Sequence, residues 1–255
     1  MAFFEDHGDG RFRATAHTTG PWDARFQHGG PPSALLGRAI ERVEPRDDVM
    51  VARMTVEILG AVPVGDLELR SRMARPGRSV ELVEAALSHQ GRDVMRASAW
   101  RVRRTADVAV PARVPAAPPL PEPQSEREVP GWVEGYLQAI EWRWVTGHLV
   151  DPGPATAWAR MRHPLVDGEE PSPLTRVLAV ADSGNGASSE LDLRSWHFIN
   201  PELTVHLHRE AVGEWVCLDA STTVSTGGVG LATSYLSDRQ GPLGVGAQSL
   251  LVQPR

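Results

Sequence analysis

The sequence predicts an α+β protein made of two tandem units, each with one long helix packed against an antiparallel sheet. Two observations predict it. The same order of elements, a helix followed by four strand-like runs, occurs twice, and a Pro-dense stretch separates the two occurrences. The chain has 255 residues, 41% of them hydrophobic, so each of two compact halves can bury a core.

The first repeat begins with a helix predicted over residues 31–43. Apolar residues recur there at helical spacing, and two prolines stand at its start, where a helix tolerates them. Turn signals separate the four strand-like runs that follow, which are 49–59, 67–74, 79–89 and 94–102. A further strand is expected before the helix, near residues 10–16.

The second repeat has the same order. A helix is predicted over residues 173–182 and ends at a Gly-rich turn, and additional strands are expected before it within 137–162. The four strand-like runs after it are 196–208, 214–223, 229–236 and 243–252. Aligning Met54 with Leu203 gives an offset of 149 residues, and aligning Gly91 with Gly241 gives 150, so the register holds across each half.

A long helix followed by an antiparallel meander is typical of a hotdog fold, in which the sheet wraps around the helix. One such unit leaves a sheet edge and apolar surface exposed, and two units side by side bury both. We therefore predict a double hotdog. Its parts are an N-terminal unit (1–105), a stiff Pro-rich linker (106–130) and a C-terminal unit (131–255).

Charge and composition exclude several classes of protein. The net charge of −6 argues against a nucleic-acid ligand, which needs a concentrated basic surface. Cys217 has no partner for a disulfide, and residues 1–20 lack the basic start and apolar stretch of a signal peptide. No apolar run is long enough to span a bilayer. We therefore expect a cytoplasmic protein with no membrane insertion.

Three segments resemble the acyl-CoA thioesterase II family and its actinobacterial relatives. They are FQHGGPPSALLGRAI (26–40), FINPELTVHLHR with GEWVCLDASTTVSTGGVGL (198–231), and GVGAQSLL (244–251). The resemblance covers the chain except the linker. It implies hydrolysis of acyl-CoA to free acid and CoA without a cofactor or metal. It also implies a carboxylate, a Thr and a Gln in the second unit that hold the attacking water, and matching the segments places these at Glu202, Thr223 and Gln248.

These three residues suit the chemistry, because a carboxylate can take a proton from water while hydroxyl and amide groups orient it. Glu202 departs from the family, whose carboxylate is an Asp, one carbon shorter. Each residue also has a plain structural interpretation: Glu202 as a solvated strand start, Thr223 as an ordinary strand residue and Gln248 as a surface residue. Asp182, just before the Gly-rich turn, is a reserve candidate for the base, although such an Asp more often ties down a turn.

His28, Gly29 and Gly30 precede the first helix and are expected to bind substrate. Glycine lets a ligand approach the backbone, and a helix start presents free N–H groups that could polarise a thioester carbonyl. Some single-hotdog thioesterases carry a similar HGG with a catalytic carboxylate nine residues after the His. That position is Gly37 here, so the first unit lacks this base, and its HGG could equally shape a pocket or start the helix.

Three other functions stay open. An enoyl-CoA hydratase of the same fold needs a D-x-N-P-x-H pattern, which Phe198 and Leu203 break. A non-catalytic acyl-CoA binding protein would keep the pocket without the chemistry. A metal-dependent enzyme is suggested by His206 and His208, which alternate on a strand, although two exposed histidines explain them equally well. Acyl-CoA is the expected ligand, and a homodimer of such chains is left open.

Overall fold

The computed structural model describes residues 1–21, 23–105, 110, 116–125, 127, 129, 132, 134–192 and 194–255. In the first half the elements are β1 (Phe4–Asp6), β2 (Arg11–Ala14), η1 (Ala16–Thr18), α1 (Gly30–Arg42), β3 (Val49–Ile58), β4 (Asp66–Arg75), β5 (Val80–His89) and β6 (Arg92–Arg103). In the second half they are α2 (Tyr136–Ala139), β7 (Ile140–His148), β8 (Asp151–Met161), α3 (Pro173–Ala181), α4 (Gly184–Ala187), β9 (Trp196–Ile199), β10 (Glu202–Leu207), β11 (Val216–Val224), β12 (Val229–Asp238) and β13 (Gly241–Pro254).

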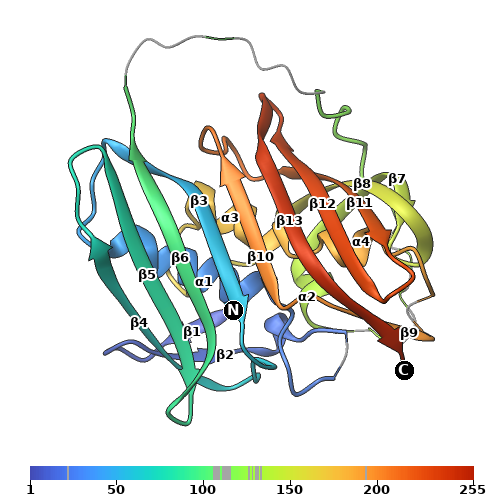
Figure 1. Cartoon of the computed structure of the whole chain (residues 1–255), viewed down its shortest axis with the longest axis horizontal. Helices are drawn as coiled ribbons and strands as arrows, with labels where there is room; N and C mark the ends of the chain where they lie inside the picture. Colours follow the sequence, from blue (N-terminus) through green and yellow to red (C-terminus); the bar gives the residue numbers. More distant parts are fainter. Residues whose placement is uncertain are drawn as a thin grey trace.

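The strands form one antiparallel sheet whose order is a palindrome. From its centre the order runs β3, β6, β5, β4, β2, β1 in one direction and β10, β13, β12, β11, β8, β7 in the other, while β9 pairs with β13. Each strand of the first half therefore has a counterpart at the same distance from the centre. The long helices α1 and α3 lie on the same side of this sheet, behind it in Figure 1.

The two halves meet where β3 pairs with β10. Thr55 lies opposite Thr204, and their hydroxyl oxygens lie 3.1 Å apart, within hydrogen-bond distance. These two residues are related by the repeat offset found in the sequence. The axis that relates the halves therefore passes beside this pair.

The sheet has an inner face, turned toward α1 and α3, and an outer face. Strict alternation assigns side chains to them: along β12, Ala232, Ser234 and Leu236 are buried, while Leu231 and Tyr235 are exposed. The inner face and the helices enclose the main core, to which α1 contributes Leu35, Leu36 and Ile40 and α3 contributes Val177 and Leu178. A side chain's face therefore decides whether it can approach the helices.

Both predicted helices and the predicted strands are present, with one difference that matters for the site. The predicted run 196–208 is two strands, β9 and β10, separated at Asn200 and Pro201. Proline has no N–H to donate to a neighbouring strand, so pairing is interrupted there. The break frees Asn200 from the ladder.

Much of the predicted Pro-rich linker lies outside the described residues. The described stretch 116–125 packs on the second half: the Trp158 indole donates to the Pro118 carbonyl (3.1 Å), and the Trp144 amide donates to the Gln124 side chain (2.8 Å). Ala117 and Leu120 contact the cluster that holds Trp158 and Cys217. This stretch is therefore docked against the second half.

Candidate active site

A buried carboxylate stands at the C-terminal end of α3. Ser172 caps the start of this helix and Asp182 ends it, with only 4% of Asp182 exposed. Burying a carboxylate is costly unless polar groups are placed to receive it. Its neighbours therefore indicate what Asp182 is for.

Two amide side chains hold one oxygen of Asp182. The Asn200 Nδ2 group donates to Asp182 Oδ1 at 2.8 Å, and the Gln248 Nε2 group donates to the same atom at 3.3 Å and to the Asp182 carbonyl at 3.0 Å. Gln248 is fixed in turn, because its Oε1 accepts the Asn185 backbone N–H at 2.9 Å. The carboxylate is thus held in one orientation by groups from α4, β13 and the β9–β10 break.

The second oxygen, Oδ2, faces the start of α1. It lies 3.5 Å from His28 Nδ1, and an added Cβ on Gly29 would come within 2.6 Å of it. Within the part of the chain that the structure describes, no group donates a hydrogen bond to Oδ2. This atom is also not fully enclosed by protein atoms. Asp182 therefore presents one unoccupied, accessible oxygen toward the first half.

Glycine at 29 and 30 lets α1 approach α3 this closely. A Cβ on Gly30 would lie 2.3 Å from the Ala179 carbonyl oxygen, closer than real atoms pack. The Gly30 N–H donates to His28 Nδ1 at 3.0 Å, which folds the imidazole back over the helix start. The HGG sequence thus brings the first half to the carboxylate of the second.

An aromatic side chain of α2 supports His28. The rings of His28 and Tyr136 stack with centroids 3.8 Å apart and nearly parallel planes. The Tyr136 hydroxyl donates to the Ala179 carbonyl at 2.7 Å and lies 2.8 Å from the Ser183 hydroxyl. Burial raises the pKa of Tyr136 and lowers the pKa of His28, so both rings are neutral at pH 7.

The structure does not bring Glu202, Thr223 and Gln248 together, so the expected convergence is wrong. Gln248 is on the inner face, opposite Ala232, whereas Thr223 is exposed on the outer face. Glu202 is also on the outer face, where its carboxylate accepts the Ser249 N–H at 2.7 Å and the Thr204 hydroxyl at 3.1 Å. Successive residues of a strand point to opposite faces, which explains both misplacements.

Two residues of the site escaped the sequence reasoning as functional candidates. Asn200 carries a signal, since an Asn-Pro pair interrupts an otherwise regular strand run. Tyr136 carries none, because only its stack with His28 distinguishes it. The neighbour of Thr223, Thr222, is the inward residue, and its hydroxyl lies 2.8 Å from the Ser188 hydroxyl beside α4. The residue predicted from the sequence, Thr223, is therefore the immediate neighbour of the residue that faces inward.

The other candidates stand apart from this cluster. His206 is exposed on the outer face, and the described residues contain no group of three or more His, Cys, Asp or Glu side chains that could hold a metal. Cys217 is buried, and burial raises its thiol pKa to about 12, which disfavours the thiolate. Neither arrangement supplies a nucleophile or a Lewis acid near Asp182.

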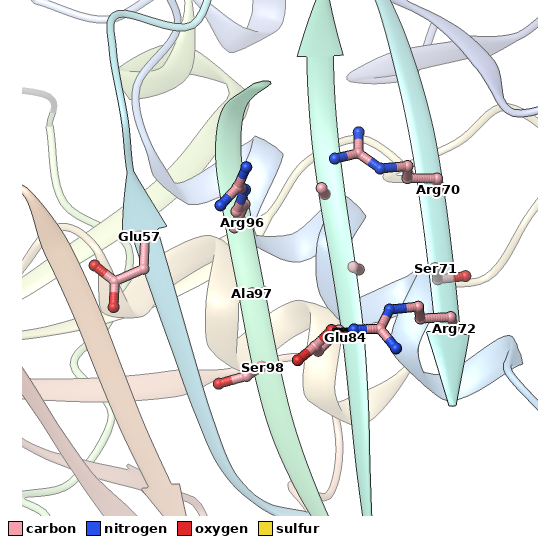
Figure 2. A pocket seen from close by; sticks show the side chains of 10 residues that line it. Glu57, Arg70, Ser71, Arg72, Glu84, Arg96, Ala97 and Ser98 are labelled. Atoms are coloured by element: carbon pink, nitrogen blue, oxygen red, sulfur yellow. Dashed lines mark hydrogen bonds and ion pairs between the residues drawn. The ribbon is translucent and has the colours of Figure 1, made fainter. Parts of the chain in front are cut away.

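A hollow of about 460 Å³ lies on the outer face of β3 to β6, away from Asp182. Figure 2 shows the charged side chains of Arg70, Arg72, Glu84 and Arg96 that line it. Its arginines are paired: Arg70 and Arg96 both contact Asp93, at 2.6 and 2.7 Å, and Arg72 contacts Glu84. The hollow is therefore a surface feature of compensated charge.

Comparison with known proteins shows which family this fold belongs to. The model of the acyl-CoA thioesterase N-terminal domain matches residues 18–102, and that of the acyl-CoA thioesterase C-terminal domain matches residues 111–252. A search of curated proteins found no sequence match.

Solved structures share the fold over nearly the whole chain. A protein with hot dog fold from Alicyclobacillus acidocaldarius is 16% identical, covers 98% of this chain and 95% of its own, and has a TM-score of 0.73. The tesB protein of Mycobacterium avium is 19% identical, with coverages of 98% and 96% and a TM-score of 0.68. The acyl-CoA thioesterase II TesB2 of Mycobacterium marinum is 17% identical, with coverages of 99% and 95% and a TM-score of 0.68.

The fold and the matched domains define a thioester hydrolase of hotdog architecture. The chain belongs to the acyl-CoA thioesterase family, which confirms the resemblance found in its sequence. Among the described helices, none has the length and apolar character needed to cross a membrane.

Proposed function

We propose that the chain hydrolyses acyl-CoA thioesters with Asp182 as the general base. One observation carries this proposal: Asp182 is buried, with Oδ1 held by Asn200 and Gln248 and Oδ2 accessible and without a donor. A base needs a lone pair directed at its water, and a fixed carboxylate supplies one. Asn200 and Gln248 orient the base through its other oxygen, Oδ1.

The reaction balances with these groups alone. Water bound at Asp182 Oδ2 attacks the thioester carbonyl carbon while its proton passes to the carboxylate, and the carbonyl oxygen becomes an oxyanion. Collapse of this intermediate breaks the C–S bond, and the departing sulfur takes the proton back from Asp182. The products are a free acid and CoA, and no cofactor takes part.

Two finer features belong to the same proposal. The palindromic strand order and the pairing of Thr55 with Thr204 support a double hotdog with units at 1–105 and 131–255. The site draws on both units, since Asp182 and Gln248 come from the second and His28 from the first. Glu202 and Thr223 have no role in it. Gln248 stays in the proposed site, but there it orients the Asp182 carboxylate rather than the attacking water.

A thiol-release assay over acyl-CoAs from short to long tests the reaction and gives the preferred chain length. Asp182→Asn keeps the shape and removes proton acceptance, so we expect kcat to fall at least about 100-fold. The matched control is Glu202→Gln, which should retain most of the wild-type kcat.

Loss of activity in the Glu202 variant with a functional Asp182 variant would restore the assignment taken from the sequence. Circular dichroism of both variants separates a chemical effect from unfolding. Absence of CoA release by the wild-type chain across the whole panel would refute the proposed reaction.

A further inference from the structure

The start of α1 offers few backbone donors to a substrate. Pro31 and Pro32 have no N–H, and the Ser33 N–H donates to the Gly29 carbonyl at 3.1 Å. The Gly30 N–H is committed to His28 Nδ1. Of the backbone N–H groups that were expected to polarise a thioester, only that of Gly29 is left. The other hydrogen-bond donor at this position is the His28 side chain.

The hydrogen bond from Gly30 selects one tautomer of His28. Because Nδ1 accepts that bond, the single proton of the neutral ring is on Nε2. Burial lowers the pKa of His28, which keeps the ring neutral near pH 7. Nε2 has no hydrogen-bond partner among the described residues, and it is not fully enclosed by protein atoms. An accessible N–H donor is therefore present beside Asp182.

The ring that carries this donor is held rigidly. Stacking on Tyr136 sets its plane, the Gly30 N–H sets its rotation, and the bonded Tyr136 hydroxyl anchors the stack to α3. Donors that are already oriented stabilise a developing oxyanion most effectively, since they need no reorganisation during the reaction. The fixed orientation of the His28 ring therefore suits it to donate a hydrogen bond in the transition state.

We propose that His28 is a catalytic residue whose Nε2–H donates to the thioester carbonyl oxygen and to the oxyanion that forms from it. The inference rests on the proposed function of Asp182. Its geometric basis is that Nδ1 of the same ring lies 3.5 Å from Asp182 Oδ2, so the ring that carries the Nε2–H donor is next to the base. In the proposed complex, a thioester bound beside this ring receives the water from Oδ2 and the hydrogen bond from Nε2–H.

Three substitutions separate the two nitrogens. His28→Asn keeps an acceptor near the Nδ1 position for Gly30 but removes the distal donor. His28→Gln places a donor near the Nε2 position, and His28→Phe keeps the stack on Tyr136 with neither nitrogen. We expect kcat to fall about 100-fold to 1000-fold for Asn and Phe, with KM little changed, and to fall less for Gln. The control His206→Asn, on the outer face, should retain wild-type kcat.

Equal losses for Asn and Gln, or a rise in KM with kcat intact, would overturn the donor role in favour of a structural or binding one. Two-bond ¹H–¹⁵N correlation of the wild-type protein gives an independent readout: we expect the Nε2–H tautomer, and an Nδ1–H tautomer would refute the proposal.

A non-hydrolysable ketone analogue of acyl-CoA should shift the His28 Nε2 resonance, whereas a thioether analogue without the carbonyl should not. A response to both analogues, or to neither, would also count against the donor role. This measurement does not need turnover, so failure of the proposed reaction and failure of the donor proposal remain distinguishable.

Discussion

At the scale of single residues, the proposed site consists of common polar side chains, and their function depends on how their neighbours orient them. Asp182 would be an unremarkable turn residue if Asn200 and Gln248 did not orient it. Their two amides leave one oxygen for a water, and Gly29 leaves space in front of that oxygen. Small changes in this space should therefore affect the reaction more than the fold.

Gly29→Ala tests the space. The added Cβ would come within 2.6 Å of Asp182 Oδ2, so the carboxylate must move or rotate. Displacement of a reacting group by about 1 Å can cost on the order of 100-fold in rate, and we expect a fall in kcat between about 10-fold and 100-fold. Steady-state kinetics with the preferred acyl-CoA measures it.

Gly186→Ala is the matched control in α4. Its Cβ would meet only the Leu149 side chain, at an ordinary contact distance of 3.8 Å, so kcat should be unchanged. If the Gly29 variant kept full activity, the unoccupied space before Asp182 would have no catalytic importance.

At the scale of elements, the two halves use the same positions differently. Gln248 has Ala232 and Thr222 beside it on neighbouring strands, and the counterpart row in the first half is Ala99, Val83 and Met73. That row contains no polar side chain, so it cannot orient a carboxylate as Gln248 does. This apolar row is one reason why we assign the base to the C-terminal end of α3 and not to that of α1.

The C-terminal end of α1 is closed by a buried ion pair. Arg101 donates to the Val43 carbonyl at 2.7 Å and lies 2.6 Å from Glu81, and both charged side chains are at least 96% buried. Asp182 and its amide partners mark the corresponding end of α3. In the first half, the corresponding helix end is thus occupied by a structural ion pair.

Arg101→Met tests this structural role. The substitution leaves Glu81 buried with Arg46 as its remaining cation. It also removes the hydrogen-bond donor to the Val43 carbonyl at the end of α1. Removing one partner of a buried pair costs about 3–5 kcal/mol. Because Arg46 still contacts Glu81, we expect the free energy of unfolding to fall by about 3 kcal/mol. Urea unfolding followed by circular dichroism measures it.

The comparison pair is Arg72 and Glu84, whose side chains are 69% and 39% exposed. Arg72→Met should cost less than about 1 kcal/mol, because solvent screens surface pairs. The double variant Arg101→Met with Glu81→Leu should recover part of the stability lost. Equal destabilisation by the two single variants would argue against the capping role.

At the scale of the whole molecule, stability and function both depend on the contact between halves. Pairing of β3 with β10 makes the sheet continuous, and α1 with α3 completes the core behind it (Figure 1). A separated half would expose an unpaired strand edge and the apolar surface of one helix. Neither half contains both His28 and Asp182.

We therefore expect residues 1–105 or 131–255, expressed alone, to aggregate or to form dimers without thioesterase activity. Coexpression of the two should yield a soluble complex, because each supplies the edge and helix surface that the other lacks. Size-exclusion chromatography with light scattering measures the assembly, and thiol release measures the site. A well-behaved monomeric half would contradict the mutual dependence of the units.

The sequence by itself determined the elements and their order. Spacing of apolar residues located α1 and α3, and strand-like runs between turn signals located most strands within a few residues. The offset of 149 residues aligned Thr55 with Thr204, the pair that the structure then placed beside the axis between the halves. These features are local or repetitive, so they can be found without knowing which segments touch. The family resemblance followed from the same segments.

The tertiary structure alone decided which polar residues meet. Alternation distinguishes Thr222 from Thr223 but does not tell which of them faces the helices, because that depends on how the sheet packs. The approach of His28 to Asp182 joins residues 154 positions apart and requires the crossing of α1 with α3. A carboxylate becomes a candidate base through burial, orientation and an unoccupied oxygen, and these properties exist only once the two halves are packed together.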